Sequence, residues 1–204
     1  MRDVISDTGA AVVGGADPVQ ALNDAAATIN TVIGAYGNAL ERLLGAGAKT
    51  LLVPNLPDLG AIPETAAQGP EAQFLASTLT GLWNAGIAEM TAGLSLLHGD
   101  ADILLLDVNT LFNQILVDPD GFGFSNVTDG CILLPDPPDT CDGFAFWDVI
   151  HPTTQAHALV GQAAAELLEA RAVPAPAALV LMLAGIAGVV AVRRRRKVAR
   201  LTAG

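Results

Sequence analysis

Two short, continuously apolar segments, TLLV at 50–53 and ILLL at 103–106, constrain the fold most strongly. Each follows a long stretch in which apolar residues recur every three or four positions, as they do along one face of a helix. Short apolar runs of this kind are typical of strands buried on both faces of a parallel sheet. Because strand and helix alternate, the sequence predicts an α/β fold with a parallel sheet and helices on both faces.

Two long helices are expected. The first begins at Pro18, with Asp17 as the N-cap and Gln20 closing a capping box. Its expected buried face consists of Leu22, Ala26, Ile29, Ile33, Tyr36, Leu40 and Leu43. The second helix spans 70–97, and its expected inward residues are Leu79, Leu82, Ile87, Met90, Leu94 and Leu97.

The other segments are expected to be shorter or less regular. Residues 1–16 are predicted to be irregular, and Asn109 is predicted to cap a short helix. Residues 118–145 are expected to form a long loop, and 153–171 a final helix. Since two parallel strands cannot make a stable sheet with both faces covered, further strands are expected from sequence before Met1.

Charge is distributed unevenly along the chain. The formal net charge is −11, yet six of the ten basic residues lie between Arg193 and Arg200. Residues 1–171 therefore hold four basic against 21 acidic groups, a net charge of −17. An acidic body of this kind repels phosphate backbones, which argues against nucleic acid as a partner.

A C-terminal apolar run, AALVLMLAGIAGVVAV at 177–192, is followed at once by RRRRK at 193–197. The run predicts a short transmembrane helix, with the arginine end cytoplasmic and the acidic body facing outward. The alternative is a buried core helix, which four arginines at its end disfavour. With the preceding VPAPA at 173–177, this tail resembles the PEP-CTERM class of sorting signals in its VPxPA variant. The resemblance implies export and processing by an exosortase-type transpeptidase.

The chain has two cysteines, Cys131 and Cys141, in one polar stretch. Their spacing favours a small disulfide-closed loop formed in an oxidising compartment. The alternative is a pair of unrelated thiols. No further cysteine or clustered histidine completes a ligand set, so no metal site and no cofactor is expected.

The string FWDVIHPT at 146–153 is the strongest chemical signal. Asp148 precedes His151 by three residues, and Pro152 leads into a helix start. A carboxylate that binds one ring nitrogen of a histidine fixes its tautomer and stabilises the imidazolium, so the pair can act as general base for an alcohol nucleophile. Trp147 either lines an acyl pocket or only braces the loop.

This string resembles the last sequence block of the SGNH (GDSL) hydrolase superfamily. A second stretch, GAGAKTLLVPNLPDLG at 45–60, is similar to the branch that includes lecithinases and thermolabile haemolysins. The resemblance covers most of residues 1–171. It implies a flavodoxin-like three-layer α/β/α fold, metal-free hydrolysis of esters of lipids, acyl chains or acetylated sugars, and catalytic roles for Asp148 and His151.

The nucleophile of the family, a serine in a G-D-S motif, has no counterpart here. The serines of the chain stand in other contexts: Ser6, Ser77, Ser95 and Ser125. The G-x-N-D motif that supplies the oxyanion asparagine is poorly matched by Gly15-Ala16-Asp17. In relatives, a stretch like Met1–Val4 follows that motif directly. We therefore expect the serine and the oxyanion donors to lie upstream, and this chain alone to be inactive.

Two parts are thus expected: 1–171 as the C-terminal part of an SGNH hydrolase domain, and 172–204 as a sorting and transmembrane tail. The expected location is outside the cytoplasm, either anchored in the inner membrane, periplasmic, or at the cell surface after sorting. The leading hypothesis is an exported ester hydrolase. The alternative is a non-catalytic surface or binding protein that keeps the scaffold.

Overall fold

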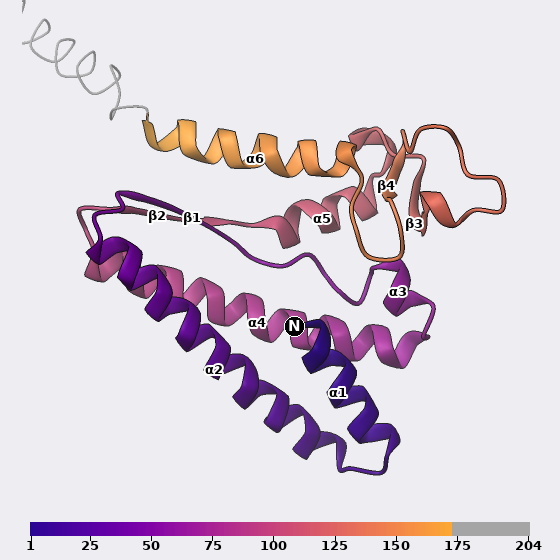
Figure 1. The fold of residues 1–204 in the computed structure, drawn as a ribbon, viewed down its shortest axis with the longest axis horizontal. Helices are drawn as coiled ribbons and strands as arrows, with labels where there is room; N and C mark the ends of the chain where they lie inside the picture. Colours follow the sequence, from indigo (N-terminus) through magenta and orange to yellow (C-terminus); the bar gives the residue numbers. More distant parts are fainter. Residues whose placement is uncertain (173–204) are drawn as a thin grey trace, which may run out of the picture. The chain divides into compact units, whose positions relative to one another are not determined.

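In the computed structural model three helices pack against one another: α1 (Arg2–Val13), α2 (Pro18–Gly45) and α4 (Pro70–Leu97) (Figure 1). The structure describes residues 1–172. Residues 1–164 form one unit, and a second begins at Ala165, of which only 165–172 are described.

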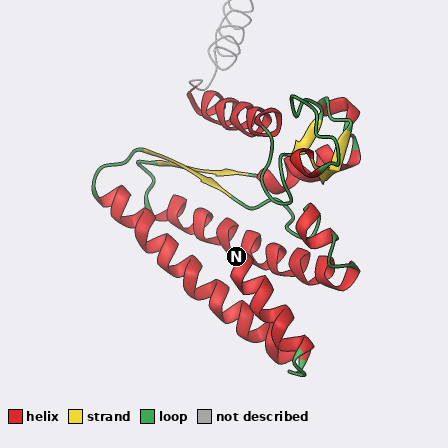
Figure 2. Ribbon diagram, turned by 45° about the vertical axis from the view of Figure 1, so that its right-hand side comes forward, coloured by secondary structure: helices red, strands yellow, loops and turns green. Residues whose placement is uncertain are grey.

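The parallel strand pair predicted from the two apolar segments is present. Strand β1 (Thr50–Pro54) pairs in parallel with β2 (Asp102–Leu106) (Figure 2). In this register Leu52 lies opposite Leu104. The α/β class is therefore confirmed. Burial is less complete than predicted for β1, where Val53 is fully buried but Leu51 and Leu52 are only half-buried. Within the described residues, β1 and β2 pair only with each other.

The main core lies between the long helices and this strand pair. Its buried side chains are Ala25, Ile29, Ile33, Leu40, Leu44, Val53, Leu79, Ile87, Leu94 and Ile103. The predicted inward faces of α2 and α4 are thus largely confirmed. Leu43, Leu82 and Leu97 are corrections, because each is exposed where the helix turns its edge away from the core. At the N-terminus of α2, the Asp17 side chain accepts hydrogen bonds from the backbone N–H groups of Val19 and Gln20.

Residues 2–13 are helical, so the prediction of an irregular N-terminus was wrong. Met1, Val4 and Ile5 pack on the main core, and Thr8 is buried. Packing against α2 and α4 therefore stabilises a helix that its local sequence alone does not predict. Gly15, with φ of 94°, turns the chain from α1 into α2.

Residues 118–145 also contain more structure than predicted. Strand β3 (Asn126–Gly130) pairs in parallel with β4 (Phe144–Phe146), and the pairing is interrupted by an irregularity in register. Two short 3₁₀ turns, Asp120–Phe122 and Cys131–Leu133, complete the segment. Strands this short show no usable hydrophobic period, which explains the error.

The remaining helices are α3 (Pro63–Ala66), α5 (Val108–Val117) and α6 (Thr154–Ala172). Asp107, rather than the predicted Asn109, is the N-cap of α5, because its side chain accepts from the Thr110 backbone N–H. No helix within residues 1–172 is long and apolar enough to cross a membrane. The predicted span at 177–192 lies outside the described residues.

Candidate active site

Asp148 and His151 are joined in one tight turn between β4 and α6. One carboxylate oxygen of Asp148, Oδ1, accepts hydrogen bonds from the backbone N–H groups of Ile150 at 2.8 Å and His151 at 2.7 Å. The other oxygen, Oδ2, lies 2.7 Å from Nδ1 of the His151 ring. A single carboxylate therefore holds both the backbone of the turn and the direction of the imidazole.

The same contacts keep Asp148 ionised. The hydrogen bond from the His151 backbone N–H is the main cause that lowers the pKa of Asp148, to about 2. Partial burial opposes the shift, while the Ile150 N–H and the His151 ring add to it. An ionised carboxylate can only accept hydrogen bonds, so the proton between the two side chains resides on Nδ1.

The other ring nitrogen, Nε2, is thereby left as a proton acceptor. The side chain of His151 is 68% exposed, whereas that of Asp148 is only 22% exposed. A partly buried carboxylate behind an exposed imidazole is the arrangement in which a histidine can take a proton from a hydroxyl and be stabilised as it does so.

We expect the carboxyl of Asp148 to titrate near pH 2, which ¹³C NMR can measure. In the urea-unfolded chain the pKa of the same carboxyl should return to about 3.9. Because the pKa is lower in the folded state, ionised Asp148 stabilises the fold above about pH 4, and this contribution is lost as the pH falls toward 2. A folded-state midpoint near 4 would show that the turn does not hold the carboxylate as described.

Neighbouring backbone groups fix the turn in place. Trp147 donates its N–H to the His151 carbonyl at 2.8 Å, and the Thr153 N–H donates to the Ala145 carbonyl at 3.0 Å. From α3, the backbone N–H of Glu64 donates to the Val149 carbonyl at 2.9 Å. Trp147 thus braces the loop through its backbone. Its side chain does not line the small apolar cavity that lies beside the turn and is described below.

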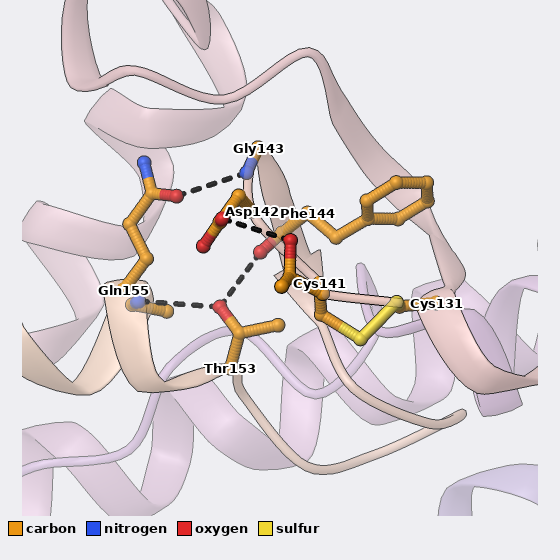
Figure 3. The surroundings of a disulfide bond; sticks show 9 residues. Cys131, Cys141, Asp142, Gly143, Phe144, Thr153 and Gln155 are labelled. Carbon is orange, nitrogen blue, oxygen red and sulfur yellow. Dashed lines mark hydrogen bonds between the residues drawn. A yellow bond between two sulfur atoms is a disulfide. The ribbon is translucent and has the colours of Figure 1, made fainter. Parts of the chain in front are cut away.

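Thr153 connects the turn to the start of α6. Its hydroxyl donates to the Phe144 carbonyl at 2.7 Å and accepts from the Ala156 N–H at 3.3 Å. The Gln155 side chain accepts from the Gly143 N–H at 3.0 Å, so α6 is fastened to the beginning of β4 at two points (Figure 3).

A narrow apolar cavity of about 100 Å³ adjoins the turn. Ile150 and Pro152, on either side of His151, are part of its wall. The rest of the wall includes Leu59, Ile62, Leu111, Phe112, Ile115 and Phe146. Phe112 and Phe146 meet edge to face, with ring centroids 5.9 Å apart. The lining can accept only hydrocarbon groups, because it offers almost no hydrogen-bonding partners.

The segment 55–60 supports this region through hydrogen bonds to its neighbours. Asn55 donates from Nδ2 to Asp107 Oδ1 at 2.8 Å and accepts from the Asn109 backbone N–H at 2.9 Å, which ties the ends of β1 and β2 together. Burial disfavours the charge of Asp107, but the Thr110 N–H and hydroxyl and the Asn55 amide together keep its pKa below the ordinary value.

Asp58 and Gly60 join the same segment to α4. Asp58 Oδ1 accepts from the Ser77 hydroxyl at 2.8 Å and from the Gly60 N–H at 2.9 Å. A Cβ on Gly60 would lie 2.0 Å from Ser77 Oγ and 2.3 Å from the Gln73 carbonyl oxygen, so only glycine fits. These residues are structural, since their polar groups are occupied by partners within the fold.

Comparison with known protein families shows to which family this chain belongs. The model of the GDSL-like lipase/acylhydrolase family matches residues 11–164, which include the turn with Asp148 and His151. The chain belongs to this family.

Proteins similar to this GDSL-like chain come from plants and bacteria. A GDSL esterase/lipase of Arabidopsis thaliana is 26% identical over 63% of this chain and 37% of its own length. The thermolabile hemolysin of Vibrio parahaemolyticus is 27% identical over 62% of this chain and 34% of its own length. The phosphatidylcholine-sterol acyltransferase of Aeromonas hydrophila is 24% identical over 67% of this chain and 53% of its own length. The chain thus spans about a third to a half of these relatives.

Three of the four serines of this GDSL-like chain donate hydrogen bonds elsewhere in the fold. Ser77 donates to Asp58, Ser95 to the Thr91 carbonyl at 3.0 Å, and Ser125 to the Gly143 carbonyl at 3.3 Å. Ser6 lines a separate groove beside α1. Within residues 1–172, no serine is hydrogen-bonded to His151.

The structure joins Cys131 and Cys141 by a disulfide bond (Figure 3). Cys131 is completely buried directly after β3, and Cys141 lies just before β4. The bond therefore closes the loop between the two strands that precede the turn.

Proposed function

We propose that this chain carries the acid–base half of a Ser-His-Asp ester hydrolase. The observation that carries the proposal is the 2.7 Å contact between His151 Nδ1 and Asp148 Oδ2, made by an exposed ring and an ionised carboxylate. Family membership supports ester hydrolysis at the level of the family.

In the proposed reaction, His151 Nε2 takes the proton of a serine hydroxyl as its oxygen attacks the ester carbonyl. Asp148 stabilises the imidazolium, which then gives the proton to the departing alcohol. In the second half of the reaction, water hydrolyses the acyl-enzyme. His151 takes a proton from the water as its oxygen attacks the acyl carbonyl, and then gives that proton to the departing serine oxygen. No metal is required for these steps.

We propose that the serine and the oxyanion donors lie in sequence preceding Met1. Two observations support this placement: Ser77, Ser95 and Ser125 donate hydrogen bonds elsewhere in the fold, and the chain spans only part of its relatives. The same upstream sequence would supply further parallel strands beside the β1–β2 pair and complete a flavodoxin-like three-layer sheet.

The proposed substrates are carboxylic esters with an apolar acyl part, such as lipid, acyl or acetylated sugar esters. The apolar cavity beside His151 supports this class, because it favours hydrocarbon and penalises charge. The tail beyond residue 172 is proposed to direct export, to anchor the protein through residues 177–192, and to serve as substrate for an exosortase-type enzyme.

A second candidate is a non-catalytic exported binding protein on the same scaffold. It is favoured by one observation, the absence of any hydrogen bond between His151 and a serine within residues 1–172. Sequence upstream of Met1 separates the two candidates, because only the hydrolase needs G-D-S and G-x-N-D motifs there.

Hydrolysis of p-nitrophenyl acetate tests the proposal. We expect no enzymatic turnover by the 204-residue chain and measurable turnover once it is extended by its upstream coding sequence. Turnover by the 204-residue chain that depends on His151 would refute the upstream nucleophile. An inactive extended chain carrying both motifs would favour the binding protein.

A further inference from the structure

Gly130, the last residue of β3, lies directly against the backbone of Asp148. A Cβ placed on Gly130 would be 2.6 Å from the Asp148 carbonyl carbon and 2.8 Å from its Cα. The backbone of Gly130, with φ of −75° and ψ of 120°, is one that any residue adopts. Glycine is therefore required here for space and not for conformation.

The end of β3 is anchored and cannot easily retreat from this contact. Gly130 is in register with Phe146 of β4, and the next residue, Cys131, is completely buried and bonded to Cys141 (Figure 3). The Ile132 N–H then donates to the Trp147 carbonyl at 3.0 Å. The strand pairing, the disulfide and this hydrogen bond thus hold the end of β3 beside Trp147, the residue before Asp148.

We propose that this disulfide-anchored strand end, through Gly130, positions the Asp148–His151 pair. The backbone of Asp148 rests on Gly130, while Val149 is held from α3 by the Glu64 N–H at 2.9 Å. A methyl group at position 130 must displace Asp148 by several tenths of an ångström, and the ring of His151 moves with it. Gly130 is a positioning residue, and its catalytic importance rests on the proposed function.

The test compares Gly130→Ala with Gly161→Ala, a glycine of α6 whose Cβ would meet nothing within 4 Å. NMR of the 204-residue chain follows the Nδ1–H signal of His151 and the amide signals of Ile132 and Glu64, which report the turn without any need for activity. We expect these signals to move in Gly130→Ala and to stay in place in Gly161→Ala. A folded Gly130→Ala variant with unmoved signals would overturn the proposal.

In the upstream-extended chain, Gly130→Ala should lower kcat about 10- to 100-fold with KM nearly unchanged, because a misplaced base affects the reaction more than binding. Gly161→Ala should leave kcat unchanged. An unchanged kcat in Gly130→Ala would contradict the proposal. If the unmutated extended chain is itself inactive, the proposed function fails, and the NMR comparison still decides the positioning role.

Should Gly130→Ala not fold, the anchor is tested instead by Cys131→Ala with Cys141→Ala. This variant keeps Gly130 but frees the strand end from the loop. We expect the same three signals to move and their amides to exchange faster with solvent. Unmoved signals and unchanged exchange would show that the strand end does not position the turn.

Discussion

Replacing His151 with alanine in the upstream-extended chain is expected to lower kcat for ester hydrolysis about 10⁴-fold. In the proposed reaction the ring takes the serine proton, and Asp148 Oδ2 lies 2.7 Å from its Nδ1. Without it, the hydroxyl must attack with no base, and only substrate binding and the oxyanion donors remain to accelerate the reaction. Steady-state hydrolysis of p-nitrophenyl acetate measures the loss.

His157→Ala is the matched control for this prediction. His157 lies on α6, six positions after His151, and its side chain is exposed. Its backbone N–H donates to the Thr153 carbonyl at 2.9 Å, a contact that alanine keeps. We expect full activity from the control. Equal losses in the two variants, or a His151→Ala enzyme within a few-fold of the unmutated rate, would show that His151 is not the base.

Removing the disulfide with Cys131→Ala and Cys141→Ala is expected to lower the free energy of unfolding by about 3 kcal/mol. The bond spans a sequence separation of 10 residues, and breaking it returns the entropy of that loop to the unfolded chain. Urea denaturation followed by circular dichroism measures the change.

Reduction of the unmutated chain with dithiothreitol is the control, because it breaks the same bond without changing the packing of Cys131. The reduced chain and the double variant should lose similar stability. A double variant within about 0.5 kcal/mol of the oxidised chain would mean that the loop is held by its other contacts.

Local signals account for what could be predicted of the fold. The long helices α2 and α4 begin at Pro18 and Pro70, the predicted starts, and Asp17 caps α2 ahead of the proline at its first position. The two apolar runs pair as parallel strands, which gives partners to backbone groups that would otherwise be buried without hydrogen bonds. Each of these features is encoded within a few residues.

Features set by distant contacts could not be predicted. Helix α1 depends on packing of Val4 and Ile5 against the core, and its own residues give only a weak helical signal. Asp107 caps α5, whereas the side chain of Asn109 donates to the Leu56 carbonyl, 53 residues away. Such choices are made between competing polar partners that only the folded chain brings together.

The candidate site divides in the same way. The contact between Asp148 and His151 spans three residues and follows from the local turn, so the sequence could indicate it. The contacts that hold that turn come from Gly130 and Glu64, which no motif marks as related to it. A glycine that is needed only for space looks like any other glycine until its neighbour is known.

Covalent labelling with a fluorophosphonate, which reacts with activated serines, tests the central claim most directly. The upstream-extended chain should be labelled at one serine preceding Met1, and His151→Ala should abolish the labelling, while the 204-residue chain should remain unlabelled. Mass spectrometry locates the modified residue. Labelling of Ser6, Ser77, Ser95 or Ser125, or labelling of the upstream serine that survives the loss of His151, would contradict the account.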